Sequence, residues 1–192
     1  MGPHPTRDGK SVQDDALVRR SRQGDREAFN ELVSRYQVPV YRVIRGIVAN
    51  PAECEDVAQE VFLKAYASLA RFRGDSGFFT WVYRIAVNEA LRARKRKGFS
   101  TVTTDAVAEV EAPRREEPEE DGPTLATLER LLGKLNDEFR TIVVLRDVEG
   151  LSYQEIAETL EIPMGTVESR LFRARQELRL LWKRTKEARH AL

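Results

Sequence analysis

The stretch "LSYQEIAETLEIPMGTVESRLFRARQELRLL", residues 151–181, decides the fold of the C-terminal part of the chain. Ser152 and Glu155 have the spacing of a capping box, which predicts the start of a helix. Pro163 is expected to end that helix, and Thr166 is expected to act as the N-cap of a second one. The stretch therefore predicts two helices that are separated by a tight break.

The residues around the break favour a helix-turn-helix. Ala157 is small at the point where two crossing helices approach closely, and Val167, ten residues later, is expected to face back into the contact. Gly165 is expected to help to stop the chain, whereas Glu161 occupies the turn position where glycine is common. This spacing is typical of a DNA-binding helix-turn-helix. A plain helical hairpin is the alternative at this point.

The second helix has two contrasting faces when its residues are placed at about 100° per residue. The stripe expected to be buried consists of Val167, Leu171, Ala174, Leu178 and Leu181. The opposite face carries arginine, serine and glutamine, which can reach base edges and phosphates, and a phenylalanine, which can contact thymine methyl groups. Residues 170–189 add eight Lys or Arg against two Glu, a basic extension suited to phosphates. The residues predicted to contact a DNA major groove are Thr166, Glu168, Ser169, Phe172, Arg173, Arg175 and Gln176.

A second unusual face lies on the helix expected from Thr80 to Lys97. Five residues spaced three, four, four and three apart share it: Trp81, Arg84, Asn88, Arg92 and Lys95. A tryptophan within a basic and amide stripe suits stacking on unpaired bases while cations hold the backbone. The alternative is a solvated basic face with the tryptophan tucked into the core. The preceding loop offers glycines and aromatic rings where a flipped base could lodge, and its candidate residues are Phe72, Arg73, Gly74, Asp75 and Ser76.

The helix expected over residues 55–69 also carries a candidate surface. Its buried face is predicted to contain Val57, Ala58, Val61 and Ala65. The opposite face sets an exposed leucine among acidic and amide groups, in the set Asp56, Gln59, Glu60 and Leu63. Such a mixture is typical of a protein-binding patch. A plain solvated face remains the alternative.

Charge and periodicity divide the chain of 192 residues into four segments. Residues 1–97 have a net charge of +6, residues 98–123 of −6 and residues 124–192 of +1. Helical periodicity fails in the acidic, proline-containing middle segment, which indicates a linker without a core. The sequence therefore predicts an all-α protein: a disordered N-terminus (1–11), a first helical domain (12–97), a flexible acidic linker (98–123) and a second helical domain (124–192). Within the first domain, Asp25 and Pro51 are expected at helix starts, and Pro39 is expected to kink or divide a helix.

Several classes of site find no support in the composition. Cys54 is the only cysteine, so no disulfide within the chain is possible, and His4 and His190 lie at the two ends. We therefore expect no metal, no cofactor and no catalytic activity. The start, "MGPHPTRDGK", has no apolar segment of a signal peptide, and no apolar run approaches the length of a membrane span. A cytoplasmic protein without membrane insertion is the expectation.

Two segments carry a resemblance to a known family. "ECEDVAQEVFLKAYASLARFRGDSGFFTWVYRIAVNEALR" and "LSYQEIAETLEIPMGTVESRLFRARQELR" closely resemble the extracytoplasmic-function (ECF) sigma factors of bacterial RNA polymerase, of the sigma-E-like type. The match extends over roughly residues 12–97 and 124–185. It implies a promoter-recognition subunit that binds the β and β′ subunits of core polymerase and directs initiation at the promoters of a stress or envelope regulon. It also implies an anti-sigma factor as a partner.

The resemblance further implies roles for the candidate residues. In "DVAQE", Asp56, Gln59 and Glu60 match the segment that grips the β′ clamp helices. The loop "FRGDSGF" and Asn88 match the elements that capture and read a base of the −10 element. Trp81 matches one member of a duplex-opening tryptophan pair, but its neighbour is Val82, so half of that wedge is absent. On the second helix of the helix-turn-helix, the positions matching −35 contacts are Ser169, Phe172 and Arg173, and Glu168 replaces a residue that is often basic.

Two other classes of protein compete with this interpretation. A conventional helix-turn-helix regulator with an N-terminal sensing domain would bind DNA alone and would not require core polymerase. A DNA-processing enzyme such as a recombinase would need a clustered nucleophile or carboxylate set in the N-terminal half. No such set stands apart from the helix surfaces in this sequence.

Overall fold

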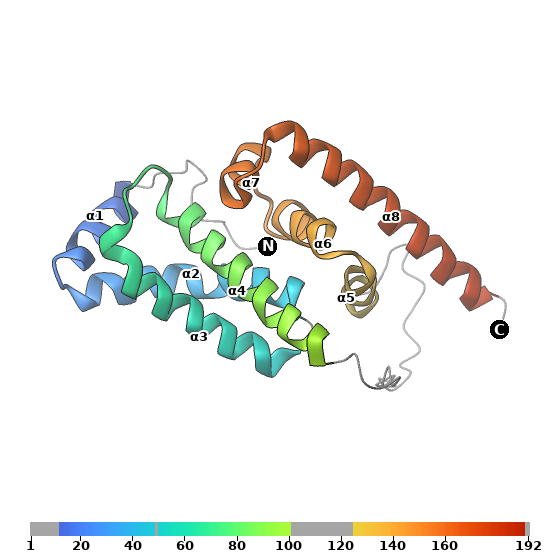
Figure 1. The fold of residues 1–192 in the computed structure, drawn as a ribbon, viewed down its shortest axis with the longest axis horizontal. Helices are drawn as coiled ribbons and strands as arrows, with labels where there is room; N and C mark the ends of the chain where they lie inside the picture. The colour runs from blue at the N-terminus through green and yellow to red at the C-terminus, as the bar shows by residue number, and fades with distance from the viewer. Residues whose placement is uncertain (1–11, 49, 101–124, 191–192) are drawn as a thin grey trace.

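The structure is a computed structural model that describes residues 12–48, 50–100 and 125–190. These residues form helices and contain no strand, as the periodicity predicts (Figure 1). The N-terminal half consists of α1 (Val12–Arg22), α2 (Arg26–Ile47), α3 (Pro51–Ser68), a 3₁₀ turn (Leu69–Arg71) and α4 (Phe78–Ser100). The C-terminal half consists of α5 (Leu125–Lys134), α6 (Asp137–Val143), a π-helical turn η2 (Val144–Val148), α7 (Tyr153–Leu160) and α8 (Met164–His190). The predicted tail, residues 1–11, and residues 101–123 of the predicted linker lie outside the described residues.

Local signals start α2 and α3 where the sequence predicts. Asp25 caps α2 by accepting a hydrogen bond from a backbone N–H of the first turn at 3.1 Å, and Pro51 is the first residue of α3. Pro39 lies inside α2 and does not divide it, whereas the kink that the sequence analysis offered as the other outcome stays a prediction. Tyr36 and Val40, on either side of the proline, are 3% and 0% exposed. Burial of this helix face outweighs the loss of one backbone hydrogen bond.

The first turn of α4 is fixed by a buried ring. The prediction that Thr80 caps this helix is wrong, because α4 begins at Phe78, which is 2% exposed. The backbone N–H of Trp81 already donates to the carbonyl of Gly77 at 3.2 Å. At its other end α4 continues through Ser100, past the predicted domain boundary at residue 97.

The capping box of α7 is present as predicted. The Ser152 hydroxyl accepts a hydrogen bond from the backbone N–H of Glu155 at 3.2 Å, and the Glu155 carboxylate accepts one from the backbone N–H of Ser152 at 2.6 Å. At the other end of α7, Glu161 has a φ of 55° and lies in the left-handed region. This conformation favours glycine after a helix, which explains why glycine is common at the position that Glu161 occupies here.

The second helix of the motif begins earlier than the sequence indicates. α8 starts at Met164, so Gly165 and Thr166 lie in its first turn, and the predictions that they stop the chain and cap the helix are wrong. The carbonyl of Pro163 instead accepts hydrogen bonds from the backbone N–H groups of Thr166 and Val167 at 2.9 and 3.2 Å. Pro163 therefore occupies the N-cap position of α8, three residues before Thr166, which was predicted to occupy it.

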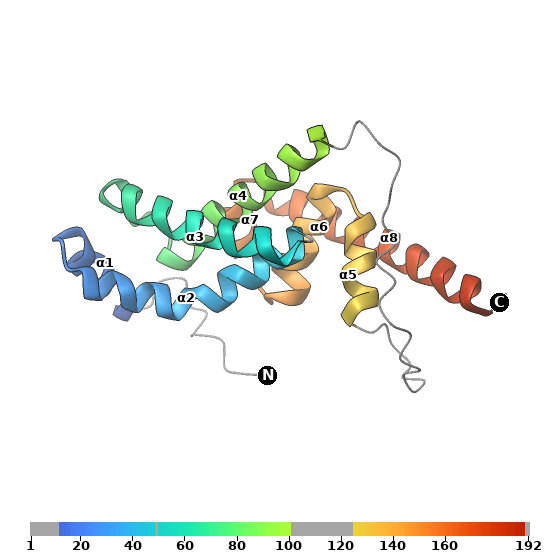
Figure 2. The ribbon, with the colours of Figure 1, turned by 90° about the horizontal axis from the view of Figure 1, so that it is seen from below.

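The two helical units predicted from the sequence are both present, and they also pack against each other. Seen from below, α1, α2 and α3 lie on one side, α5 and the end of α8 lie on the other, and α4 and α7 lie between them (Figure 2). One continuous cluster of buried apolar side chains includes residues of α1 to α4 and of α5 to α8. The C-terminal half is therefore seated directly on α2 and α4.

Candidate nucleic-acid and polymerase interfaces

The outward face of α8 is oriented as the periodicity predicts. The stripe on its inner side is buried or half-buried: Val167, Leu171 and Ala174 are at most 1% exposed, and Leu178 and Leu181 are half-buried. The opposite side carries four exposed residues, which we call the recognition face: Ser169, Phe172, Arg173 and Gln176. Phe172 is 62% exposed, so its ring projects from the side of α8 that faces away from the core. An aromatic ring held in water beside an arginine suits a surface that is covered by a ligand.

The flank of the recognition face is partly engaged within the protein. The guanidinium of Arg175 donates two hydrogen bonds to the carboxylate of Asp147, at 3.2 and 2.5 Å. The hydrogen bonds to Asp147 raise the pKa of Arg175. Glu168 is exposed and Thr166 is half-buried. Arg175, one of the predicted DNA-contacting residues, is therefore bound to Asp147 in this structure.

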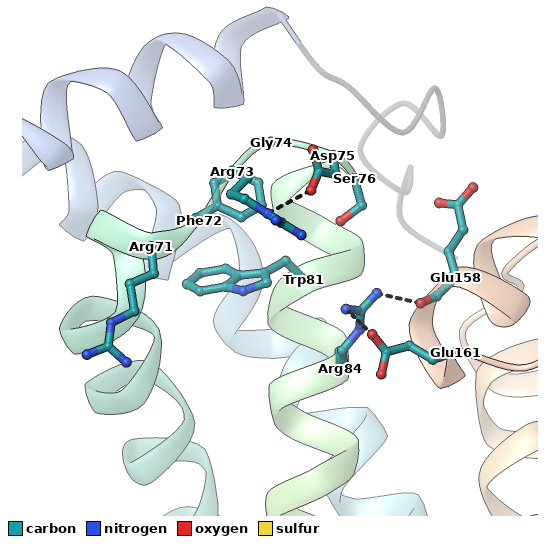
Figure 3. A pocket seen from close by; sticks show the side chains of 10 residues that line it. All are labelled: Arg71, Phe72, Arg73, Gly74, Asp75, Ser76, Trp81, Arg84, Glu158 and Glu161. Carbon is teal, nitrogen blue, oxygen red and sulfur yellow. Dashed lines mark hydrogen bonds and ion pairs between the residues drawn. The ribbon is translucent and has the colours of Figure 1, made fainter.

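A cavity of about 510 Å³ lies between the loop before α4 and the first turns of that helix. Figure 3 shows its lining: the loop residues from Arg71 to Ser76, Trp81 and Arg84 of α4, and two glutamates of the C-terminal half. Gly74 in this loop has a φ of 78° and no heavy atom within 4 Å of a built Cβ, so the loop is open at its tip. Arg73 and Asp75 are exposed and form an ion pair at 3.0 Å. The sequence analysis predicted that a flipped base could lodge in this loop, and the residues of the loop line this cavity; binding of a base there stays a prediction.

Trp81 lies between the two alternatives that the sequence left open. It is half-buried, with its ring centre 4.9 Å from that of Phe72 and 5.6 Å from that of Phe78. Phe72 itself is 7% exposed and belongs to the core. The tryptophan ring therefore packs against the buried rings of Phe72 and Phe78. Its remaining surface lines the cavity. Phe72, which the sequence analysis counted among the candidate base-contacting residues, is mostly buried and packs against the Trp81 ring.

The other members of the Trp81 stripe differ in their partners. Arg84 is half-buried and donates to the carboxylate of Glu161 at 2.7 Å and to the backbone carbonyl of Glu158 at 2.6 Å. Arg92 is exposed and pairs with the buried Glu89 at 2.7 Å. Asn88 and Lys95 are exposed. No local pattern predicts that Glu158 and Glu161, at the end of α7, contact this stripe, because both lie more than seventy positions away from Arg84.

The predicted polymerase patch, Asp56, Gln59, Glu60 and Leu63, forms one outer face of α3. Leu63 is 64% exposed, whereas Val57, Val61 and Ala65 on the other face are at most 3% exposed. Glu60 is half-buried and contacts Lys64 at 2.7 Å, and this hydrogen bond lowers the pKa of Glu60. Lys64 also contacts Glu89 of α4 at 2.5 Å. Lys64 therefore links Glu60 of the patch to the buried Glu89 of α4.

One buried carboxylate was missed by sequence reasoning. The side chain of Glu149, which follows η2, has 0% exposure and accepts two hydrogen bonds from the Arg42 guanidinium, at 2.7 and 3.0 Å. It also accepts one from the hydroxyl of Tyr83 at 3.1 Å. Burial and the neighbouring carboxylate raise the pKa of Tyr83, so its hydroxyl stays protonated and donates. The only signal in the sequence is a glutamate directly after the apolar run "TIVVL", and that does not name its partners.

Two further classes of site are absent from the described parts of the chain. Residues 12–48, 50–100 and 125–190 contain no group of three or more His, Cys, Asp or Glu side chains that could hold a metal ion. No helix in these same ranges is long and apolar enough to cross a membrane.

Comparison with known proteins identifies both halves of the chain. Residues 32–99 match the sequence model of Sigma-70 region 2, and residues 125–178 match that of Sigma-70, region 4. The chain is 42% identical over 179 residues to the RNA polymerase sigma-H factor of Pseudomonas aeruginosa, covering 86% of this chain and 92% of the relative. It is 42% identical over 178 residues to the ECF RNA polymerase sigma-E factor of Haemophilus influenzae, covering 87% of this chain and 94% of the relative.

A solved structure extends this similarity to three dimensions. The structure of CnrH in complex with the cytosolic domain of CnrY superimposes with a TM-score of 0.69 at 26% identity, covering 89% of this chain and 97% of that one. The helical fold, the two matching regions in order and the identity to full-length relatives agree. The chain therefore belongs to the extracytoplasmic-function (ECF) sigma factors of bacterial RNA polymerase.

Proposed function

We propose that this sigma factor engages its targets through three separate surfaces. The polymerase patch on α3 binds core polymerase, the recognition face of α8 reads the −35 duplex, and the α4 cavity takes an unpaired base of the −10 element. The observation that carries the proposal is the outward face of α8, where Phe172 is 62% exposed opposite a stripe that is buried on the core. The protein works in the cytoplasm, where its polymerase is, and has no catalytic activity of its own.

Reading of the −35 element follows from the chemistry of the recognition face. Arg173 can donate two hydrogen bonds to a guanine edge or reach a phosphate, Ser169 can do either singly, and Phe172 can contact a thymine methyl group. Glu168 places a carboxylate at the edge of this surface, where it can accept a hydrogen bond from the amino group of cytosine and repels phosphate. Arg175 reaches the backbone once it leaves Asp147.

Opening of the −10 element uses the α4 cavity. A flipped base needs a pocket with a stacking surface, and Trp81 presents its ring to the cavity above Phe72 and Phe78. Cations are needed along the strand, and Arg84, Arg92 and Lys95 lie on the same side of α4. Asn88 is exposed within this stripe, where its amide can read a base edge.

Binding of core polymerase uses the polymerase patch. The β and β′ subunits are the expected partners, and Asp56, Gln59 and Glu60 offer acceptors around the apolar Leu63. An apolar centre with a polar rim is the usual anatomy of a protein interface. A pull-down of the tagged chain from the source bacterium tests this directly, because it must recover both β and β′. Recovery of DNA but of neither subunit points to the conventional helix-turn-helix regulator instead.

An anti-sigma factor is the expected regulator. The similar CnrH was solved with the cytosolic domain of CnrY, and a sigma factor RpoE of Bartonella quintana with the anti-sigma factor NepR shares the fold, with a TM-score of 0.64. We expect a partner of this kind to hold the protein inactive until an envelope or other stress signal releases it. Promoters of a stress regulon are the corresponding targets.

Arg173→Ala is expected to weaken binding to a −35 duplex by about 1–3 kcal/mol if the guanidinium contacts a base. The measurement is fluorescence anisotropy over a salt series, on the −35 duplex of a promoter that the protein and core polymerase transcribe. A contact with phosphate alone predicts an equal loss on all sequences and a salt slope smaller by about one. Arg130→Ala, at an exposed position of α5, is the matched control. If Arg173→Ala and Arg130→Ala give the same affinity and slope, Arg173 is not at the interface.

Trp81→Ala is expected to impair promoter opening much more than closed-complex formation, because the ring gains a stacking partner only when bases are unpaired. The expected loss is about 1–3 kcal/mol for one stacked base. Permanganate reactivity of thymines in the −10 region measures opening, and footprinting of the −35 region measures the closed complex. Trp81→Phe keeps a ring over Phe72 and is expected to retain most of the opening. Unchanged thymine reactivity in Trp81→Ala would assign the tryptophan to core packing alone.

A further inference from the structure

The Trp81 ring at the α4 cavity belongs to a group of four aromatic rings, Tyr36, Phe72, Phe78 and Trp81, which we call the ring cluster. Trp81 contacts Phe72 and Phe78, whose own ring centres lie 6.3 Å apart. Phe78 also contacts Tyr36 of α2, with a distance of 5.5 Å between the ring centres. The other three members are at most 7% exposed, whereas Trp81 is only half-buried. Because protein interiors are closely packed, the orientation of the Trp81 ring depends on the three rings beside it.

A buried hydrogen bond attaches the ring cluster to α1. The hydroxyl of Tyr36 donates to the carboxylate of Asp14, a residue of α1 that is 5% exposed. The same carboxylate accepts a hydrogen bond from the Arg35 guanidinium at 3.0 Å. Burial and the contact with Asp14 raise the pKa of Tyr36, so its hydroxyl stays protonated and donates. Because an unpaired charge in the interior is costly, this carboxylate keeps its donors and fixes the Tyr36 ring relative to α1.

A second contact joins α1 to the segment that forms one wall of the cavity. Arg22, the last residue of α1, donates to the backbone carbonyl of Ala70 at 3.3 Å. Ala70 lies in the 3₁₀ turn, and the two residues that follow it, Arg71 and Phe72, line the cavity. The described lining contains no residue of α1. The helix is thus attached to the ring cluster and to this wall without lining the space that a base would fill.

We propose that Asp14 is a positioning residue for the −10 strand: through Tyr36 and the ring cluster it holds the Trp81 ring in the orientation on which a flipped base stacks. This inference rests on the proposed function of the cavity. A ring that is already held in place loses no freedom when the base arrives, so more of the stacking energy contributes to promoter opening. Neither the recognition face nor the polymerase patch includes a member of the ring cluster. Loss of the contact between Asp14 and Tyr36 should therefore affect opening and spare the other two functions.

The test removes the contact between Asp14 and Tyr36 from either side. Asp14→Ala removes the acceptor, whereas Tyr36→Phe loses a single oxygen atom and decides the test if Asp14→Ala does not fold. Asp14→Asn keeps an acceptor oxygen at the same place and is the conservative variant. The matched control is Ser21→Ala, because the buried Ser21 hydroxyl donates to the Leu17 carbonyl at 2.7 Å and this hydrogen bond stays within α1. Circular dichroism checks the helix content of every variant.

Quenching of tryptophan fluorescence by acrylamide reports the Trp81 ring in the full-length free chain. The chain has two tryptophans, and Trp182→Phe in α8 leaves Trp81 as the only one. In this background we expect Asp14→Ala and Tyr36→Phe to raise the quenching constant, because the ring is held less closely. Ser21→Ala and Asp14→Asn should stay near the background value. Since both losses cut the same hydrogen bond, the double variant should quench no more than the larger of the two single variants.

Promoter opening is measured with core polymerase by permanganate reactivity in the −10 region, with footprinting of the −35 region and core affinity as references. Asp14→Ala and Tyr36→Phe should reduce opening by roughly 2- to 30-fold, the range for residues that act on a site through packed neighbours. Both reference values should stay at the level of Ser21→Ala. The positioning role is refuted if Asp14→Ala and Tyr36→Phe match Ser21→Ala in quenching or in opening. Failure of the proposed function would show differently, because Trp81→Ala would then open the promoter as the wild type does, whatever the quenching constants are.

Discussion

Gln59→Ala combined with Glu60→Lys is expected to abolish the association with core polymerase that is measurable near physiological salt. Both residues lie on the outer face of α3 beside Leu63, which is 64% exposed. The double change removes an amide, reverses a charge and places a second cation next to Lys64, which Glu60 contacts at 2.7 Å in the wild type. Losses of about 2–4 kcal/mol at interface hot spots correspond to roughly 30- to 700-fold in affinity.

The fold should survive this double change. An ion pair between exposed side chains four residues apart on a helix contributes only about 0.3–0.5 kcal/mol. A matched control is Glu31→Lys with Gln37→Ala on α2, because Glu31 forms the equivalent contact with Arg35 at 2.5 Å. Co-purification and titration with labelled core polymerase measure the effect. If the Gln59/Glu60 variant binds core as tightly as the α2 control does, the polymerase patch is misassigned.

Arg140→Met is expected to lower the free energy of unfolding by about 3–5 kcal/mol, because several buried carbonyl groups lose their donor and each unsatisfied group costs about 1–3 kcal/mol. Arg140 is 1% exposed, and its guanidinium donates to the carbonyls of Leu132, Leu135 and Ile47 at 2.6, 3.0 and 3.3 Å, and to that of Gly133. The arginine therefore supplies donors to carbonyls at the C-terminal ends of α5 and α2, which lack partners within their helices. Methionine fills a similar volume and donates nothing.

The loss is a large part of the 5–15 kcal/mol that is typical of a folded domain. Thermal and urea unfolding, followed by circular dichroism, measure it. Arg140→Lys keeps the charge but lacks the planar fork of donors, so we expect an intermediate loss. Arg130→Met, at an exposed position of the same helix α5, is the control. A change below about 1 kcal/mol in Arg140→Met would show that water replaces the guanidinium without cost.

Local patterns predicted much of this molecule. The buried and exposed sides of α8 follow from a period of 3.6 residues alone, because Leu171 and Phe172 differ only in the side on which they project. The capping box of Ser152 and Glu155 is equally local. The two wrong predictions of helix starts arose where a residue near the predicted cap, and not the predicted capping side chain, marks the start of the helix. Phe78 starts α4 ahead of Thr80, and the start of α8 is set by Pro163.

Contacts between distant segments could not be predicted from one sequence. Arg84 has the position of a strand-binding cation on α4, and nothing local indicates that Glu161, 77 positions later, occupies it. Glu149 reads as one more acidic residue after an apolar run, yet it is enclosed by groups from α2 and α4. Burial of a charge is a property of the assembled fold, since it depends on which elements supply the partners.

The central claim is that this chain directs core polymerase to start transcription at promoters with two recognised elements. The most direct test is to sequence the 5′ ends of transcripts made by purified core polymerase on fragmented genomic DNA, with and without the protein. We predict a set of start sites that depend on the protein, share one upstream motif near −35 and another near −10, and disappear with Gln59→Ala and Glu60→Lys. A protein that binds duplex DNA by itself and adds no start site to those of core polymerase would contradict the account.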